Sequence, residues 1–309
     1  MKIIDLKNNR QVEKAEKPIC LLLGNFDGVH LGHSRLAEAA VEEGKKLGIK
    51  VGVWTFEKHP LCFLGNGVLT LTDNNEKNRL FAEKGIDYVI YEDFMESKDI
   101  SAIDFVKNVL IEKYDCKTVV CGFNFKFGQK GQGTAEFLKE EMEKMGRKAV
   151  IVLPVCKNEK VVSSTEIRNF LEQGMVEEAA EMLGRPYSIE LPVLHGNEIG
   201  RTIGIPTINQ KFPEGKMILK NGIYACKCIV DGKEYLGVSN VGSRPTVNED
   251  KNDVNCETHI IDYEGWLYDK NVRVCFYKRL RDEQRFDSIE CLKKAVEHDI
   301  IHTKSYFGK

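Results

Sequence analysis

Short apolar runs alternate with stretches of helical periodicity through the first half of the chain. Residues 18–23 (PICLLL) form one such run, which ends at Gly24. A continuous apolar run of this length is typical of a strand that is buried on both faces of a parallel sheet. The repeated pairing of run and helix predicts a doubly wound, mostly parallel sheet. The predicted strands are 18–23, 50–56, 88–91, 118–121 and 149–153, and the predicted helices are 33–47, 76–84, 102–113 and 135–145.

The second half of the chain is rich in β-forming residues. Two short helices are predicted first, at 164–172 and 176–183, and Gly184-Arg185-Pro186 then interrupts the helical pattern. We therefore predict a Rossmann-like α/β domain over 1–185 and an antiparallel β-barrel domain over 186–309. The predicted barrel strands are 188–193, 223–230, 233–240, 255–263 and 272–279, with a hairpin at Asp231-Gly232 and a closing helix at 288–298.

Charge and cysteine usage exclude several classes of protein. The formal net charge is -2, which argues against a nucleic-acid binder with a broad basic surface. The 10 cysteines form no C-x-x-C pair, so buried free thiols are expected, with Cys226 and Cys228 on one face of a strand. Residues 1–17 lack the apolar core of a signal peptide, and no apolar run could span a bilayer. We expect a cytoplasmic protein without a membrane partner.

The segment GNFDGVHLGH, residues 24–33, is predicted to bind phosphate. It joins a strand to a helix, and its glycines let the backbone approach an anion at the positive end of the helix. His30 and His33 are placed to donate hydrogen bonds to phosphoryl oxygens. An ordinary turn with two exposed histidines fits the same pattern, and so does a metal site that also uses His59. The chain carries neither a P-loop nor a G-x-G-x-x-G motif.

A second glycine-rich segment, HGNEIGRTIGIPTIN at 195–209, opens the second domain. It is compatible with phosphate, although glycines also mark plain turns. Thr207 and Asn209 share one face of an extended segment, and their oxygens could help to bind Mg²⁺. The loop residues expected to hold the nucleotide are Gly196, Gly200, Arg201 and Gly204.

Four segments in the first half resemble the prokaryotic FAD synthetases of the nucleotidylyltransferase superfamily. Residues 24–33 resemble their G-x-F-D-G-x-H-x-G-H signature, and 56–60 (FEKHP) resemble their F-x-x-H-P loop. Residues 122–128 (GFNFKFG) resemble G-x-[ND]-[FW]-[RK]-F-G, and 163–168 (SSTEIR) resemble S-S-T-x-I-R. Four matches in the same order are far more specific than any one of them.

The resemblance implies transfer of AMP from ATP to the phosphate of FMN, with release of pyrophosphate. No protein nucleophile is needed, so the residues act by positioning and by stabilising charge. His30 and His33 would hold the ATP phosphates, and Arg168 would hold the leaving pyrophosphate. For Phe125 and Phe127, core packing is the alternative to flavin contact. The other residues implied in substrate binding are Gly24, Asn25, Phe26, Asp27, Gly28, His59, Asn124, Ser163, Ser164 and Thr165.

The second half resembles the riboflavin kinases, whose pattern is H-G-x-x-x-G-R-x-x-G-x-P-T-x-N. Further matches lie at 221–224, 240–246, 257–260 and 281–286. By this resemblance Glu257 is the general base that takes the proton of a riboflavin hydroxyl. Thr207 and Asn209 would hold Mg²⁺ and phosphates, with Arg281 and Glu283 near the flavin. The chain departs from the family pattern at Leu191, where glycine is expected, and at Pro192.

Together the two resemblances predict a bifunctional enzyme of flavin cofactor synthesis. Riboflavin and ATP would give FMN and ADP, and FMN and ATP would then give FAD and pyrophosphate, both with Mg²⁺. The alternative is an FMN adenylyltransferase whose C-terminal domain binds flavin but is inactive as a kinase. A flavin or nucleotide sensor without turnover is a further alternative. The expected partners are the small molecules riboflavin, FMN and ATP.

Overall fold

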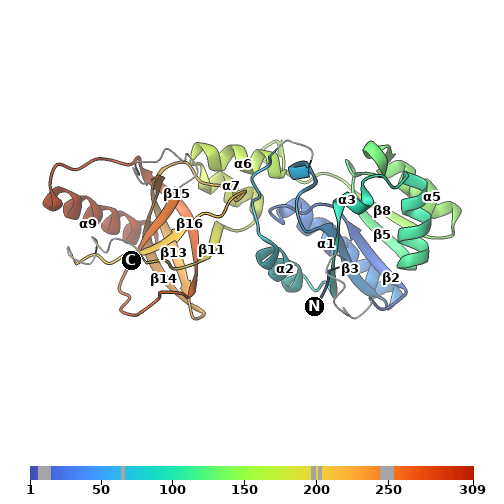
Figure 1. Ribbon diagram of the computed structural model, residues 1–309, viewed down its shortest axis with the longest axis horizontal. Helices are drawn as coiled ribbons and strands as arrows, with labels where there is room; N and C mark the ends of the chain where they lie inside the picture. The colour runs from blue at the N-terminus through green and yellow to red at the C-terminus, as the bar shows by residue number, and fades with distance from the viewer. Residues whose placement is uncertain (6–14, 64–66, 196–199, 201–203, 244–253) are drawn as a thin grey trace. The chain divides into compact units, whose positions relative to one another are not determined.

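The chain folds as two units, Met1–Ser164 and Thr165–Lys309, which are described separately (Figure 1). The helices α6 (Ser164–Gln173) and α7 (Val176–Leu183) fall at and after this division, and α7 packs against strands of the second unit. The predicted domain boundary after Arg185 stays a prediction. The computed structural model describes residues 1–5, 15–63, 67–195, 200, 204–243 and 254–309.

A parallel sheet lies at the centre of the first unit. Its strand order is β1-β4-β3-β2-β5-β8, and every pairing is parallel. The predicted doubly wound sheet is therefore confirmed, and the edge strand β1 is an addition to it. The strands are β1 (Lys2–Asp5), β2 (Ile19–Leu23), β3 (Lys50–Phe56), β4 (Tyr88–Glu92), β5 (Cys116–Gly122) and β8 (Lys148–Val152).

Helices cover both faces of this sheet because the strands are apolar on both sides. Ile19, Leu21 and Leu23 pack into one buried cluster, while Cys20 and Leu22 pack into another. The predicted helix over 102–113 is only partly correct, since it is π-helical from Phe105 onward. The helices are α1 (Leu31–Leu47) and α2 (Asn74–Glu83) on the second cluster, and α4 (Ala102–Asp104), η2 (Phe105–Lys113) and α5 (Ala135–Lys144) on the first.

Several short elements of the first unit were not predicted, because each is too short to show a period. They lie in the segments that connect the longer helices and strands. They are η1 (Pro60–Phe63), α3 (Phe94–Ser97), the pair β6 (Lys126–Phe127) and β7 (Gly133–Thr134), η3 (Gln129–Gly131), and the hairpin β9 (Cys156–Lys157) and β10 (Lys160–Val161).

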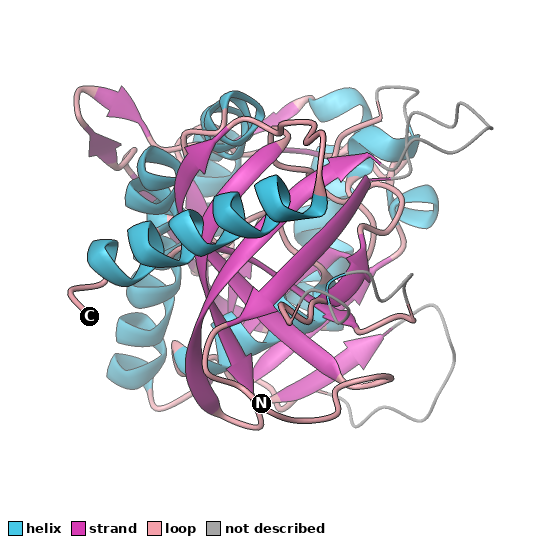
Figure 2. Cartoon of the chain, turned by 90° about the vertical axis from the view of Figure 1, so that its left-hand side faces the viewer, coloured by secondary structure: helices cyan, strands magenta, loops and turns pink. Residues whose placement is uncertain are grey.

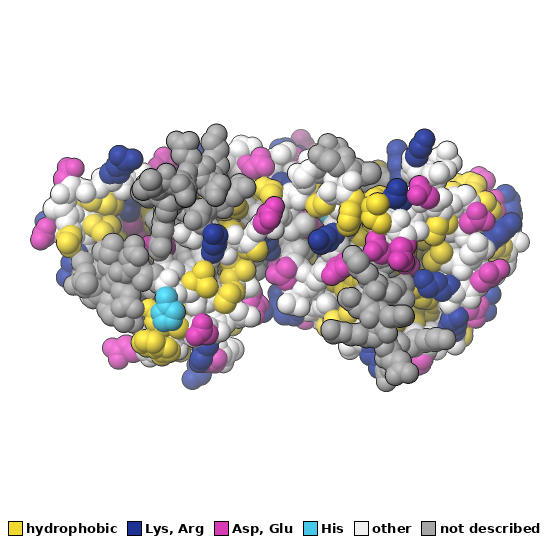
Figure 3. All heavy atoms as spheres, viewed as in Figure 1, with side chains coloured by type: hydrophobic (Ala, Val, Ile, Leu, Met, Phe, Trp, Pro, Cys, Tyr) yellow, Lys and Arg dark blue, Asp and Glu magenta, His cyan; other side chains and the backbone are white. Residues whose placement is uncertain are grey.

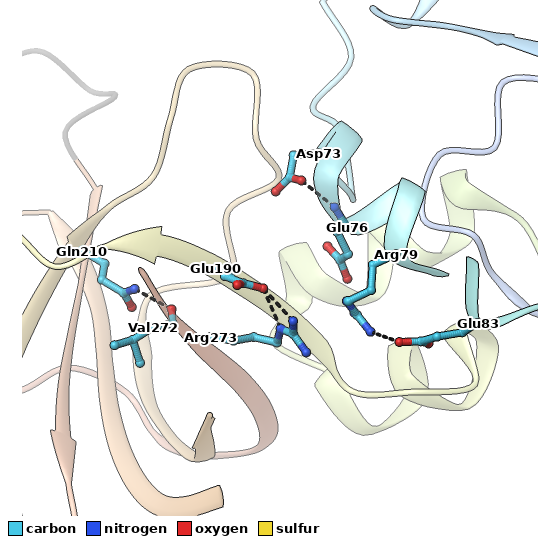
Figure 4. Close-up of polar contacts among 8 residues, drawn as sticks. All are labelled: Asp73, Glu76, Arg79, Glu83, Glu190, Gln210, Val272 and Arg273. Atoms are coloured by element: carbon cyan, nitrogen blue, oxygen red, sulfur yellow. Dashed lines mark hydrogen bonds and ion pairs between the residues drawn. The ribbon is translucent and has the colours of Figure 1, made fainter. Parts of the chain in front are cut away.

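The second unit is an antiparallel barrel, as predicted. Its strand order is β11-β16-β13-β14-β15-β12, and a bridge between Leu194 and Asn209 brings the two edge strands together. The buried Gln210 amide donates to the carbonyl oxygen of Leu191 at 2.7 Å. It also donates to the carbonyl oxygen of Val272 at 2.8 Å (Figure 4). The strands are β11 (Tyr187–Pro192), β12 (Ile208–Lys211), β13 (Gly222–Val230), β14 (Lys233–Ser243), β15 (Val254–Ile260) and β16 (Asn271–Arg281).

The C-terminal helix α9 (Ile289–Tyr306) lies across the strands of the barrel (Figure 2). The predicted end at His298 is wrong, because the helix continues to Tyr306. Ile300 and Phe307 still pack against a small apolar cluster on the barrel, formed by Ile223, Leu236, Val238 and Ile261. Asp299, whose side chain is only 3% exposed, forms a two-point ion pair with Arg281 of β16 at 3.0 and 2.7 Å. This pair attaches the middle of the helix to the barrel.

Replacing Arg281 with methionine should destabilise the second unit, because the buried Asp299 carboxylate would lose its partner. We expect a loss of about 3 kcal/mol in the free energy of unfolding, with faster hydrogen exchange along α9. The matched control is Lys304→Met, since Lys304 joins the same helix to Asp262 in an ion pair exposed at both ends. That variant should lose less than about 1 kcal/mol. Equal losses in the two variants would contradict this assignment.

The cysteines are only partly as predicted. All ten are free, and Cys226 and Cys228 are both buried on one face of β13, as expected from their spacing. Burial raises the pKa of the Cys256 thiol to about 12, so this group stays protonated and unreactive. The prediction of buried thiols is wrong for Cys62, Cys156 and Cys291, which are exposed.

The surface carries charges of both signs. On the face drawn in Figure 3, lysine and arginine side chains are interspersed with aspartate and glutamate side chains over both units. This mixture agrees with the net charge of -2. Among the described residues, no helix combines the length and the apolar character that crossing a membrane requires.

Candidate active sites

The turn Gly24–His30 joins the carboxyl end of β2 to α1, which is where ligands bind in sheets of this kind. Three of its residues have positive φ: Phe26 at 55°, Gly28 at 83° and Val29 at 38°. Positive φ is uncommon outside glycine, and for a β-branched residue it is a clear outlier. Strain of this kind persists only where the surroundings hold it, and it gathers at functional sites.

His30 is the N-cap of α1, so the helix begins at Leu31 rather than at the predicted His33. Its ring is buried, and Nδ1 accepts a hydrogen bond from the backbone N–H of His33 at 3.3 Å. The two imidazole rings stack, with centroids 3.6 Å apart and planes at 17°. A ring that accepts at Nδ1 carries its proton on Nε2. His30 can therefore donate from Nε2 to a phosphoryl oxygen.

Asp27 holds the turn from inside. Its side chain is buried, and Oδ1 accepts from the backbone N–H groups of Leu71 at 2.8 Å and Thr72 at 3.3 Å. Its own carbonyl oxygen accepts from the Ser164 hydroxyl at 2.8 Å. The first and last of the four FAD synthetase-like segments thus meet in the structure. Contact of Asp27 with phosphate stays a prediction.

Replacing Asp27 with alanine should destabilise the first unit, because two buried N–H groups would lose their acceptor. The expected loss is roughly 2–4 kcal/mol in the free energy of unfolding. Urea unfolding followed by the fluorescence of the buried Trp54 measures it. Asp27→Asn keeps the acceptor oxygen and should recover more than half of the loss. An alanine variant as stable as the parent would show that Asp27 does not hold the turn.

The other predicted residues of the first site lie on several different segments of the chain. His59 is half-buried, and its Nδ1 accepts from the N–H of Leu61 at 3.3 Å. Asn124 is exposed, whereas Phe127 is buried in the core with Phe125 stacked on it at 5.5 Å. Core packing is confirmed for Phe127, whereas Phe125 is half-buried and packs against the core; contact of either ring with flavin stays a prediction. Ser163 directly precedes α6, which begins at Ser164. Thr165 and Arg168 lie on that helix, in the second unit. The roles of Ser163, Thr165 and Arg168 stay predictions.

A pocket that the sequence analysis missed lies at the carboxyl ends of β3 and β4. Its cavity volume is only about 10 Å³, which is room for roughly one water molecule. Phe63 and Phe94 stack in it with centroids 5.7 Å apart, and Phe56 meets Phe94 edge to face at 5.5 Å. The sequence places aromatic residues after both strands, but only the fold brings them together. The residues that line the pocket are Glu57, Lys58, Phe63, Tyr91, Glu92, Asp93 and Phe94.

The predicted residues of the second site lie in one row across neighbouring strands. Asn209 of β12 pairs with Glu257 of β15, and Glu257 pairs with Asn240 of β14. Directly opposed residues project from the same face of a sheet. Thr207 lies two residues before Asn209, just before β12 begins. Next to it, the carbonyl oxygen of Pro206 lies 2.8 Å from Nδ1 of His259, which is two residues after Glu257. The fold therefore brings Thr207, Asn209 and Glu257 together.

Asn240 is a member of this row to which the sequence analysis assigned no role. Its Oδ1 is buried and has no hydrogen-bond partner within the described part of the chain. A buried acceptor without a donor costs free energy unless a ligand or a cation satisfies it. The sequence signal was present, since Asn240 opens one of the riboflavin kinase-like segments.

The glycine-rich loop is described only in part, because Gly196 and Arg201 lie outside the described residues. The Gly200 carbonyl accepts from the N–H of Ile205 at 2.8 Å. A Cβ at Gly200 would collide with the Ile205 carbonyl and would lie 3.5 Å from the Thr207 hydroxyl, so only glycine fits. Gly204 has a φ of 79°. The loop thus folds back beside Thr207.

Two other features of the second unit bear on its predicted site. The Glu283 carboxylate lies directly over Gly242, where any Cβ would collide with it. Leu191 and Pro192, which depart from the family pattern, are ordinary members of β11 opposite Val272 and Asn271. The strand therefore forms without the expected glycine. Contact of Arg281 and Glu283 with flavin stays a prediction.

Both halves of the chain match known families. The FAD synthetase family model matches residues 12–166, and the riboflavin kinase family model matches residues 183–307. A protein of Buchnera aphidicola from Acyrthosiphon pisum is 34% identical over 100% of this chain and 99% of its own length. The Escherichia coli K12 protein is 33% identical over 100% and 98%. Each is named "Bifunctional riboflavin kinase/FMN adenylyltransferase".

The chain belongs to the bifunctional riboflavin kinase/FMN adenylyltransferase family. The resemblance of each half is thereby confirmed. A Bacillus subtilis member is 31% identical over 100% of this chain and 99% of its own length. A crystal structure from Streptococcus pneumoniae, named as a macrolide-efflux protein, has a TM-score of 0.85 at 28% identity over 98% of this chain and 99% of that one.

Proposed function

We propose that the barrel unit of this family member makes FMN and that the α/β unit converts it to FAD. The observation that carries the proposal is the pairing of Asn209 with Glu257 across β12 and β15, with Thr207 two residues before Asn209. It places a carboxylate beside two neutral oxygen donors, as a phosphoryl transfer to a hydroxyl requires. The turn Gly24–His30 supplies the site of the adenylyltransferase step.

In the kinase step, Glu257 takes the proton of the terminal ribityl hydroxyl of riboflavin. The hydroxyl oxygen forms a bond to the γ-phosphorus of ATP, and the bond to ADP breaks. Thr207, Asn209 and the unsatisfied Asn240 oxygen fit Mg²⁺, which prefers oxygen ligands. When bound, Mg²⁺ would offset the charge of the ATP phosphates. Gly200 lets the loop lie close to the nucleotide.

In the adenylyltransferase step, a phosphate oxygen of FMN forms a bond to the α-phosphorus of ATP, and pyrophosphate leaves. Nε2–H of His30 and the N-terminal N–H groups of α1 stabilise the charge on the phosphates. We assign the leaving pyrophosphate to Arg168.

Chromatography of the products from riboflavin, ATP and Mg²⁺ tests the proposal. We expect FMN to appear first and FAD to follow, and we expect a chelator of Mg²⁺ to stop both. FAD formed only from supplied FMN would select the adenylyltransferase with an inactive kinase unit. Binding of flavin without any product would select the sensor. Cytoplasmic location and the absence of a nucleic-acid partner remain predictions from the sequence.

A further inference from the structure

Lys77 is a buried lysine on α2, beside the turn Gly24–His30, for which we propose phosphate binding. Its residue is 6% exposed, although lysine is almost never buried in a folded protein. The helix that carries it begins at Asn74, where Asp73 accepts from the N–H of Glu76 at 2.8 Å (Figure 4). Burial lowers the pKa of Lys77 to about 8, against the opposite influence of Asp27 and Asp73.

The ammonium of Lys77 lies against the backbone of the turn. Nζ donates to the carbonyl oxygen of Asn25 at 3.4 Å, and it lies 5.8 Å from the centre of the Tyr91 ring. The hydroxyl of Thr55 donates to the same carbonyl at 3.1 Å. The C=O and N–H of a trans peptide point in opposite directions. Because Lys77 and Thr55 both bind the Asn25 carbonyl oxygen, the N–H of Phe26 in the same peptide points away from them.

The segment 71–77 holds the turn at three of its residues, Asn25, Asp27 and Gly28. Asp27 accepts from the backbone of Leu71 and Thr72, and the N–H of Gly28 donates to the Thr72 hydroxyl at 3.1 Å. Lys77 adds the contact at Asn25. These contacts keep the turn in its positive-φ conformation, which is costly by itself.

The positive charge of Lys77 exceeds what the fold requires. The Asn25 carbonyl already has a neutral donor in Thr55, and an apolar side chain of the same length could fill the space of the lysine stem. The folded-state pKa lies below the ordinary 10.5, so burial of the charge lowers the stability of the fold at neutral pH. A charge retained at such a cost, next to a turn that binds phosphates, indicates a role in binding or catalysis.

We propose that Lys77 is a positioning residue of the adenylyltransferase site. Its ammonium holds the Asn25–Phe26 peptide in the orientation that receives the ATP phosphates, and it supplies a fixed positive charge beneath them. The inference rests on the proposed function of the first unit. It assigns a role to a residue outside the four family-like segments.

Lys77→Met in the full chain tests the role, because methionine has a similar length and no charge. We expect FAD formation from FMN to fall at least about tenfold, mainly in kcat, while phosphorylation of riboflavin stays unchanged. The matched control is Lys144→Met, which removes an exposed lysine paired with Glu141 on α5. Its rates should equal those of the parent.

Stability separates positioning from a merely structural role. The chain has two tryptophans, Trp54 in the first unit and Trp266 in the second, so a Trp266→Phe background reports on the first unit alone. In that background Lys77→Met should leave Tm unchanged or raise it, since a buried charge is removed. A lower Tm together with lost activity would overturn the proposal, and so would unchanged FAD formation. A parent chain that makes no FAD from FMN would instead contradict the proposed function itself.

Discussion

Replacement of His30 should reduce FAD formation from FMN by at least about a hundredfold and leave riboflavin phosphorylation intact. The imidazole can donate from Nε2 at the start of α1, which belongs to the first unit. Loss of one such donor removes stabilisation that develops in the transition state. Steady-state rates of the two reactions, each started from its own substrate, measure the effect.

His30 also caps α1, so the choice of substitution matters. His30→Ala loses the cap and should cost about 1 kcal/mol of stability in addition to activity. His30→Asn keeps a capping oxygen and removes the imidazole. Both variants should lose adenylyltransferase activity to a similar extent. If the asparagine variant stays active, capping rather than donation to phosphate is the role of His30.

Glu257→Gln should have the opposite pattern. We expect phosphorylation of riboflavin to fall about 10²- to 10⁴-fold, because glutamine keeps the shape but cannot accept the hydroxyl proton. FAD formation from supplied FMN should stay at the parent rate. Glutamine can still face Asn209 and Asn240 across the strands, so the barrel should remain intact.

A carboxylate outside the row gives the matched control for Glu257. Glu234 lies on β14 and pairs with Lys227 at 2.6 Å in an exposed position. Glu234→Gln should leave both reactions unchanged. Loss of both reactions in Glu257→Gln would contradict two independent sites, and parent-like phosphorylation would remove Glu257 from the role of general base.

Local pattern predicted the long elements well. The strand over 50–56 and the helix over 176–183 have the predicted bounds, because period and end signals coincide there. The helix that starts near Ser288 runs on to Tyr306, since its later residues pack on the barrel. The π-helical turn from Phe105 has no period that distinguishes it from an α-helix.

The motifs predicted the identity of the site residues but not their partners. His30 and Glu257 were predicted from short segments, whereas Asn240 and Lys77, which we propose as members of the two sites, were not. Asn240 reaches Glu257 only through the register of β14 with β15. Lys77 reaches Asn25 only because α2 packs beside the turn. Contacts of this kind depend on segments far apart in the chain, which local periodicity does not encode.

The roles of single residues at the two sites stay predictions. The amino-acid sequence alone predicted the fold class and the two activities. It could do so because hydrophobic periodicity and short motifs are local properties of the chain. Three contacts appear only in the folded chain: Asp27 holds the backbone of the turn, Gln210 links three barrel strands, and the buried Lys77 ammonium lies against the Asn25 carbonyl. The physical reason is that hydrogen-bond partners and burial are set by packing between distant segments.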